Sequence, residues 1–285
     1  MNTPETSSPR RIVDKSHIKL SYVTHYYLDQ KRPDTVLDLM ARYQRYAPEL
    51  LDVIQFVVVD DCSPLRFAVP DLDLNLTWLR ITDDIPWNQG GARNLGVTYA
   101  ASDKVLLTDI DHEFPEATLA RMVRMRECGR DFFKIYRTDP VTGKLRHGHS
   151  NTFLLSRARF LRLYGYDEEF CGHYGAEDYR FVKFQKYHGS RQRYLPKKYR
   201  CIPRIDVDRD EAYHGLERDL SHNTPIDARK EYEMKQYGKD AGHSRMFLRF
   251  LWEVVLERSR EVRIQRKRNP LWQKSWYWRW LVGER

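Results

Sequence analysis

Residues 54–63 read IQFVVVDDCS, a β-branched and aromatic run that stops abruptly at two aspartates. A nearly continuous apolar run of this kind is typical of a strand that is buried on both faces, as the strands of a parallel sheet are. The pattern therefore predicts a central strand over 54–59. Asp60 and Asp61 are expected at the edge of the sheet where this strand ends.

Similar strand-like runs alternate with segments of helical periodicity on either side of this stretch. Strands are expected at 18–24, 54–59, 76–81, 104–108, 132–136 and 152–156, and helices at 34–43, 91–101, 116–128 and 176–187. In the first of these helices, Val36, Leu39, Met40 and Tyr43 fall on one face. The alternation predicts an α/β fold with an open, mostly parallel central sheet and helices on both faces.

The composition is that of a folded protein with a core. Of the 285 residues, 41% are hydrophobic and 31% are charged, which excludes a disordered chain, a coiled coil and a collagen-like chain. No run of about 18 apolar residues is present, so no membrane-spanning helix is expected. Four cysteines without a C-x-x-C pair, and polar residues at 1–16 in place of a signal peptide, predict a cytoplasmic protein with reduced thiols.

The net charge of +9 is concentrated near the C-terminus. Residues 258–285 carry nine Lys and Arg residues against Glu261 and Glu284, which leaves only +2 on the rest of the chain. Four of the seven tryptophans are interleaved with this charge, namely Trp272, Trp276, Trp278 and Trp280. A helical, basic, Trp-rich extension is expected over 241–285. This extension would lie on the inner face of an anionic membrane, or it would pack against the rest of the chain or against a second copy in a homo-oligomer.

Two more carboxylates follow the strand expected at 104–108, in the sequence Asp109-Ile110-Asp111. Carboxylates held together at a sheet edge could be bridged to a diphosphate by a divalent cation, and their oxygens suit Mg²⁺ or Mn²⁺. A solvated turn or a helix cap explains the same residues without a metal. Asp60-Asp61 has a second interpretation as well, because an Asx-turn that caps the next segment needs no ligand.

Three further segments carry candidate residues. Residues 88–96, NQGGARNLG, place a cation at a helix start and suit a sugar or a phosphate, although a tight turn with small-residue helix packing explains them too. Residues 170–178, FCGHYGAED, place Glu177 and Asp178 in the first turn of a helix after a loop whose glycines and aromatic rings are common in sugar-binding loops. His147-Gly148-His149 could pair two imidazoles on one strand face, and we favour a structural or acceptor-side role for them.

In this order, the motifs resemble the family 2 glycosyltransferases, which have the GT-A fold. The motifs are Val57–Ser63, Asn88 with Ala92–Gly96, Leu107–Asp111, Gly175–Asp178 and Tyr213–Gly215, and the resemblance covers residues 18–225. It implies a GT-A-type sheet and three regions. Residues 1–16 would be a flexible N-terminus, residues 17–240 the glycosyltransferase domain, with a nucleotide-binding half over 17–136 and an acceptor half over 137–240, and residues 241–285 the C-terminal extension.

The resemblance also implies a role for each matching residue. Thr24, Asp60, Asp61, Arg93, Asn94 and Asp109 would bind the nucleotide sugar. Asp111, His214 and Asp109 would hold a divalent cation, Mn²⁺ or Mg²⁺. Asp178 would be the general base beside Glu177, and His173, Tyr174 and Trp87 would lie on the acceptor side.

The implied activity is transfer of a sugar from a nucleoside diphosphate sugar, foremost a UDP-sugar, to a hydroxyl of a glycan or lipid-linked acceptor. The anomeric carbon would be inverted, as in cell-surface polysaccharide synthesis, while Asp178 takes the proton of the acceptor hydroxyl. Two alternatives stay open. A glycoside hydrolase also uses a pair of carboxylates, and a non-enzymatic protein could bind membranes or nucleic acid through the basic tail, with nucleic acid the less favoured partner.

Overall fold

The computed structural model of the protein describes residues 14–28, 34–207 and 218–262. His214 and the tryptophans from Trp272 to Trp280 lie outside these ranges, so the predictions made for them are not tested. Within the described ranges, no helix has both the length and the apolar character that crossing a membrane requires.

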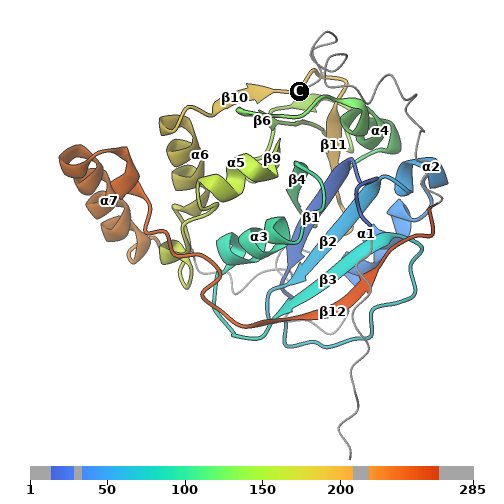
Figure 1. The fold of residues 1–285 in the computed structure, drawn as a ribbon, viewed down its shortest axis with the longest axis horizontal. Helices are drawn as coiled ribbons and strands as arrows, with labels where there is room; N and C mark the ends of the chain where they lie inside the picture. The colour runs from blue at the N-terminus through green and yellow to red at the C-terminus, as the bar shows by residue number, and fades with distance from the viewer. Residues whose placement is uncertain (1–13, 29–33, 208–217, 263–285) are drawn as a thin grey trace, which may run out of the picture.

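A large sheet forms the centre of the protein (Figure 1). In spatial order its strands are β10 (Arg191–Tyr194), β6 (Asp131–Lys134), β9 (Phe153–Ser156), β4 (Lys104–Asp109), β1 (Leu20–Tyr26), β2 (Ile54–Asp60), β3 (Asn75–Ile81) and β12 (Trp252–Arg258). The pairs β4–β1, β1–β2, β2–β3 and β10–β6 are parallel, whereas β9 and the edge strand β12 run antiparallel to their neighbours. The open, mostly parallel α/β sheet predicted from the sequence is confirmed.

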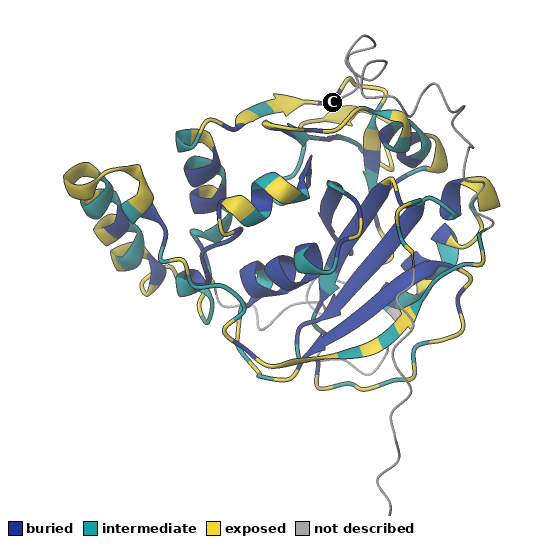
Figure 2. Cartoon of the chain, viewed as in Figure 1, coloured by how far each residue is buried: buried dark blue, intermediate teal, exposed yellow. Residues whose placement is uncertain are grey.

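Helices cover both faces of this sheet, because the buried strands alternate their side chains between two apolar cores. One core holds Phe56 and Val58 together with α1 (Asp34–Tyr43), α2 (Pro48–Leu51) and α4 (Glu116–Arg124). The other holds Val57 and Val59 together with α3 (Gln89–Thr98), α5 (Arg157–Arg162) and α6 (Glu177–Tyr187). β2 is buried along its whole length and β1 at every residue except His25, which is partly exposed (Figure 2).

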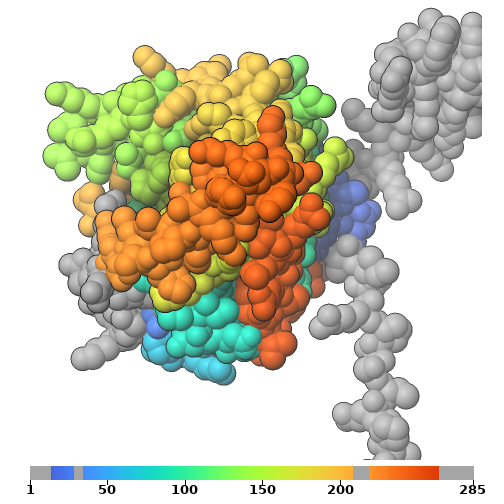
Figure 3. Space-filling view, turned by 90° about the vertical axis from the view of Figure 1, so that its left-hand side faces the viewer, coloured from blue at the N-terminus to red at the C-terminus, as the bar shows by residue number. Residues whose placement is uncertain are grey.

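The remaining elements lie at the ends of the large sheet. A small second sheet contains β5 (His112–Glu113), β11 (Arg200–Pro203), β7 (Tyr136–Thr138) and β8 (Leu145–Arg146) in that order. Away from the small sheet, α7 (Asn223–Tyr237) stands beside α6, with the 3₁₀ turns η1 (Glu168–Phe170) and η2 (Lys239–Gly242) close to it. In the space-filling view of Figure 3, α7 projects from this face in orange next to the red C-terminal segment.

Most elements predicted from the sequence are present with small shifts in their ends. The four residues predicted to share one face of α1, Val36, Leu39, Met40 and Tyr43, are all fully buried. The single strand expected at 132–136 is wrong, because the chain changes sheets there. Lys134 pairs with Tyr194 in the large sheet, and Tyr136 pairs with Arg200 in the small one.

The C-terminal prediction needs a correction in its described part. Residues 241–262 were expected to be helical, but β12 occupies Trp252–Arg258 and pairs with β3. Side chains alternate along β12, with Val254 and Leu256 partly buried and Val255 exposed, as in a strand with one covered face. An added strand satisfies the backbone groups that β3 would otherwise leave unpaired at the sheet edge, and this long-range gain outweighs the local helical tendency.

Candidate active site

A cavity of about 610 Å³ opens beyond the carboxyl end of β4, next to the start of α6. Its wall includes Asp109 and Asp111, which follow each other at the end of β4, and Glu177 and Asp178 from the first turn of α6. Ligands of open α/β sheets bind at this edge, and several hundred Å³ is the usual size of a small-molecule site. The fold therefore brings together two acidic motifs that lie far apart in the sequence.

Arg93 of α3 joins two of these carboxylates. Its side chain is 1% exposed, with Nη2 at 2.5 Å from Asp109 Oδ1 and Nη1 at 3.3 Å from Asp178 Oδ1. Nη1 also donates to the Tyr166 hydroxyl at 2.7 Å. A buried guanidinium needs compensating acceptors on its donors. Arg93 thus fixes the end of β4 relative to the start of α6.

The same cation affects its two aspartates differently. Burial acts to raise the pKa of Asp109, but Arg93 and neighbouring histidines outweigh it and lower this pKa to about 2. Burial raises the pKa of Asp178 to about 7, because the longer contact with Arg93 compensates it only in part and Glu177 and Asp109 add negative charge. At neutral pH Asp109 is an anion, whereas Asp178 exchanges its proton readily, as a general acid or base must.

Glu177 lies beside Asp178, and its carboxylate is only partly hydrogen-bonded within the described residues. Burial raises its pKa, and its Oε2 atom has no hydrogen-bond partner among the described residues. The residue before it, Ala176, has φ of 74°, in the left-handed region that costs a side chain with a Cβ about 1 kcal/mol or more. Strain and an unsatisfied carboxylate at one helix start are typical of a binding site rather than of a helix cap.

The carboxylate of Asp111 is the best suited to a divalent cation. It lines the cavity and contacts His112 Nδ1, whereas Asp109 already accepts from Arg93 and, at 3.3 Å, from Asn151. No three His, Cys, Asp or Glu side chains converge as a metal site within the described ranges. Mg²⁺ and Mn²⁺ commonly use one or two carboxylates and complete their shells with water and substrate phosphates. The residues present fit such an ion in that mode.

Three of the residues predicted to bind the nucleotide sugar, Thr24, Asp60 and Asp61, do not line this cavity. Both carboxylate oxygens of Asp60 are engaged within the chain, by Arg80 Nη1 at 2.5 Å and by the Ser63 backbone N–H at 2.8 Å. The bond to Ser63 lies three residues on, so Asp60 caps the following segment as the alternative interpretation expected, although not through the two-residue Asx-turn. Asp61 Oδ1 accepts from Asn88 Nδ2 at 3.0 Å, and the buried Thr24 hydroxyl has no partner among the described residues. Their nucleotide-binding role stays a prediction.

Arg93 and Asn94, also predicted to bind the donor, lie beneath the cavity. Asn94 is fully buried and holds the backbone of Tyr166 at two points: its Oδ1 accepts from Tyr166 N at 2.8 Å, and its Nδ2 donates to Tyr166 O at 2.9 Å. Gly165, the residue before Tyr166, has φ of 64°, and a Cβ there would collide with Asn94 Oδ1. The Arg-Asn pair thus supports the site from within the core.

The predicted acceptor-side residues divide into two groups. Trp87 and Tyr174 line the cavity, with their ring centroids 4.9 Å apart in an edge-to-face arrangement, and the Arg218 guanidinium lies 5.7 Å from the Tyr174 ring centroid. His173 does not line the cavity and instead stacks on His222, with centroids 3.4 Å apart. Aromatic walls such as Trp87 and Tyr174 suit the apolar faces of sugars.

Several cavity residues were not predicted to be site residues. Lys134, Asn151 and Gln192 come from β6, the segment before β9, and β10, and nothing in their local sequence distinguishes them. His149 does line the cavity, and the pattern His147-Gly148-His149 was a usable signal for it. The two imidazoles diverge, however, because His147 packs near Tyr136 and Tyr194.

No protein-family model matches the chain, and no curated protein matches it by sequence. Solved structures that resemble it include S. aureus TarS 1-349, with a TM-score of 0.47 and 20% identity over 66% of this chain and 60% of TarS. TarS 1-349 in complex with UDP-GlcNAc gives 0.48 and 19% over 67% and 60%. The mannosyltransferase PcManGT from Pyrobaculum calidifontis in complex with GDP-Man and Mn²⁺ gives 0.47 and 16% over 70% and 60%. Each match covers less than two thirds of the other chain, and similarity at this level does not identify a function.

Proposed function

We propose that the protein is an inverting glycosyltransferase, which moves a sugar from a nucleoside diphosphate sugar to a hydroxyl of a glycan or lipid-linked acceptor. The observation that carries the proposal is the position of Asp178, a carboxylate with a pKa of about 7 in the same cavity as Asp109 and Asp111. The resemblance of the motif order to family 2 glycosyltransferases supports it. A UDP-sugar is the foremost donor, and cell-surface polysaccharide synthesis at the inner face of the membrane is the proposed setting.

In this mechanism Asp178 is the general base. A base must be deprotonated yet take up a proton near the working pH, and a pKa of about 7 meets both needs. Asp178 would accept the proton of the acceptor hydroxyl as that oxygen attacks the anomeric carbon and the diphosphate leaves on the opposite side. Glu177, whose Oε2 has no hydrogen-bond partner in the part of the chain that the structure describes, would orient the acceptor. Trp87 and Tyr174 would stack on acceptor sugars. His173 stays assigned to the acceptor side, outside the wall of the cavity.

The residues assigned to Mn²⁺ or Mg²⁺ are Asp111 first, then His214 and Asp109. When bound, such an ion supplies positive charge for the departing diphosphate. Asp109 would assist this site by its fixed negative charge, which Arg93 maintains.

A second candidate function is glycoside hydrolysis. The observation that favours it is the pairing of two cavity carboxylates, Asp109 and Asp178, on one guanidinium. Hydrolases also keep one carboxyl protonated and the other ionised. Release of a free sugar from a glycan, without any nucleotide, would support this candidate.

Donor binding tests the proposal without knowledge of the acceptor. We expect UDP-sugars, or another nucleoside diphosphate sugar, to raise the thermal unfolding midpoint when Mn²⁺ is present, since a ligand at about 100 times its Kd adds about 2.7 kcal/mol. Asp111→Asn should fold normally and lose the Mn²⁺-dependent part of the shift. If no nucleotide sugar stabilises the wild type, or if Asp111→Asn keeps the full Mn²⁺-dependent shift, the donor and metal assignments respectively fail.

A further inference from the structure

Tyr166 is a buried tyrosine next to the cavity wall, where it contacts Arg93 but does not line the cavity itself. Its side chain is fully buried, and its ring stacks on Phe181 of α6 with centroids 4.3 Å apart and planes 8° from parallel. Because α6 also carries Asp178, this stack fixes the Tyr166 ring relative to the base candidate.

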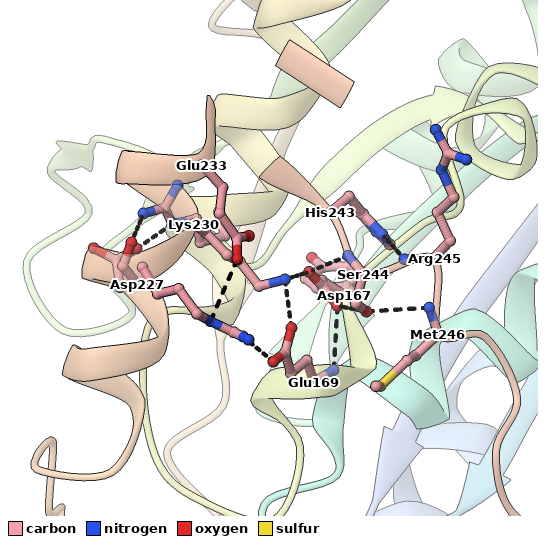
Figure 4. Close-up of polar contacts among 12 residues, drawn as sticks. Asp167, Glu169, Asp227, Lys230, Glu233, His243, Ser244, Arg245 and Met246 are labelled. Carbon is pink, nitrogen blue, oxygen red and sulfur yellow. Dashed lines mark hydrogen bonds and ion pairs between the residues drawn. The ribbon is translucent and has the colours of Figure 1, made fainter. Parts of the chain in front are cut away.

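The backbone of Tyr166 is fixed on both sides. Asn94 binds its N–H and its carbonyl oxygen, as described above. The next residue, Asp167, accepts from Lys230 Nζ at 2.8 Å and from the Ser244 backbone N–H at 3.0 Å (Figure 4). The ring stacked on α6, the backbone bound by Asn94 and the adjacent Asp167 carboxylate held by Lys230 leave the Tyr166 hydroxyl little freedom to move.

The hydroxyl of Tyr166 shares one donor with Asp178. Arg93 Nη1 lies 2.7 Å from the Tyr166 oxygen and 3.3 Å from Asp178 Oδ1. Arginine can only donate, so the Tyr166 oxygen accepts there and its own hydrogen is left for another acceptor. Burial raises the pKa of Tyr166 far above its usual range, which keeps that hydrogen in place.

We propose that Tyr166 is a positioning residue for Asp178, whose carboxylate it orients by donating a hydrogen bond from a hydroxyl that Arg93 holds in place. The inference rests on the proposed function only in naming Asp178 as the base. One Asp178 oxygen is thereby held on the Arg93 and Tyr166 side, and the other is left to face the cavity and the acceptor hydroxyl.

The charge around Asp178 sets the direction of the expected effect. Arg93 and the Tyr166 hydroxyl favour its anion, Glu177 and Asp109 disfavour it, and Lys134 of β6 faces it across the cavity. Loss of the Tyr166 hydroxyl should therefore raise the pKa of Asp178. Since a base works when it is deprotonated, the acid limb of the activity profile should move to higher pH.

Tyr166→Phe tests this step, with Tyr43→Phe as the matched control, because the Tyr43 hydroxyl is also buried and accepts a backbone N–H but lies in the other core. We expect the acid limb of kcat in Tyr166→Phe to shift up by about half to one pH unit, with the donor KM unchanged. Tyr43→Phe should leave the limb in place. A uniform loss of kcat at all pH values, or an equal shift in Tyr43→Phe, would overturn the proposal.

Two further measurements extend the test: the first keeps the ring in place, and the second follows Asp178 without turnover. Replacement of Tyr166 by 3-fluorotyrosine keeps the ring and strengthens the donor, so the limb should move to lower pH; no shift, or a shift in the opposite direction, would refute the proposal. In ¹³C-carboxyl titration of Asp178, assigned with Asp178→Asn, Tyr166→Phe should raise the midpoint whether or not a nucleotide sugar is turned over. An unchanged midpoint refutes the positioning role alone, and a raised midpoint in a protein without turnover supports that role and refutes the proposed function.

Discussion

Buried Asp167 and partly buried Asp178 each contact a buried cation, yet their pKa values move in opposite directions. Burial alone would raise the pKa of Asp167, but His243, Lys230 and Ser244 outweigh it and lower this pKa (Figure 4). Asp178 has one 3.3 Å contact with Arg93 and two acidic neighbours, and its pKa rises. The number and closeness of partners, rather than burial itself, separate the two carboxylates.

This difference separates a structural cluster from a functional one. In the anchor cluster, formed by Asp167, Glu169, Lys230 and Ser244, Lys230 Nζ lies within hydrogen-bond distance of both carboxylates, at 2.8 Å and 2.5 Å. It ties α7 and the C-terminal segment to η1. At the cavity, Glu177 and Asp178 are adjacent carboxylates whose pKa values burial raises, because the one nearby cation, Arg93, compensates them only in part. Carboxylates left undercompensated at a cavity are typical of active sites.

The largest expected effect is on the anchor cluster. Lys230→Met should cost about 3–5 kcal/mol of unfolding free energy, because it leaves the buried Asp167 and the partly buried Glu169 without their shared cation. Arg229→Met is the matched control, since Arg229 is half exposed on the same helix and contacts the same Glu169, and it should cost below about 1 kcal/mol. Urea unfolding of both variants measures the two losses of unfolding free energy. Equal costs would mean that burial of the cation is not what stabilises α7.

An intermediate effect of opposite sign is expected at Asp178. Its pKa is about 7 in the folded protein and about 3.9 when unfolded, so the folded state loses stability as the pH rises from about 4 to 7 and carries the full cost above that. Asp178→Asn should therefore raise the unfolding free energy at pH 8 by about 1–3 kcal/mol.

Asp167→Asn is the control for that measurement, because its pKa is lowered in the folded protein. The stability that Asp167 contributes is present above its unfolded pKa and is lost as the pH falls through its folded pKa, so the Asn variant should be less stable than the wild type at pH 8. Chemical denaturation at pH 8 and pH 5 compares the two. A loss of stability in both variants at pH 8 would remove the distinction between the clusters.

The smallest effect concerns the strained residue at the start of α6. Ala176→Gly should add about 0.5–1 kcal/mol of stability, because glycine adopts the φ of 74° without the clash of a Cβ. As a control, Ala158→Gly in α5, whose residue lies within the helix, should lose stability by a similar amount. A loss in Ala176→Gly, measured by thermal unfolding, would show that the left-handed residue is not strained.

Patterns confined to single elements were predicted well from the sequence. The buried face of α1 and the central strand β2 follow from residue periodicity, and the acidic motifs at the ends of β4 and at the start of α6 are visible as short sequences. The rule that sites form at the carboxyl ends of parallel strands accounts for Asp109 and Asp111 at the cavity, but not for the start of α6 beside them.

Features that depend on contacts between distant residues were not predicted. Tyr166 stands in a loop rich in aromatic residues, and only its contacts with Arg93 and Asn94 distinguish it from Tyr164 nearby. The strand β12 forms because the edge of β3 is available for pairing. The local sequence of β12 does not indicate this partner. Lys134 reaches the cavity through the placement of β6 beside β9. In each case the deciding energy comes from tertiary pairing rather than from local propensity.

The most direct test of the proposed function is turnover by the wild type, Asp178→Asn and Glu177→Gln, followed as nucleoside diphosphate released from nucleotide sugars with Mn²⁺ and saccharide acceptors. We predict turnover by the wild type with an acid limb near pH 7. Asp178→Asn should lose about 10²–10⁴-fold in kcat with an unchanged donor KM, and Glu177→Gln should lose less. The account would be contradicted if Asp178→Asn turned over at the wild-type rate, or if Glu177→Gln were inactive while Asp178→Asn stayed active. Release of free sugar from a glycan without any nucleotide would contradict it as well.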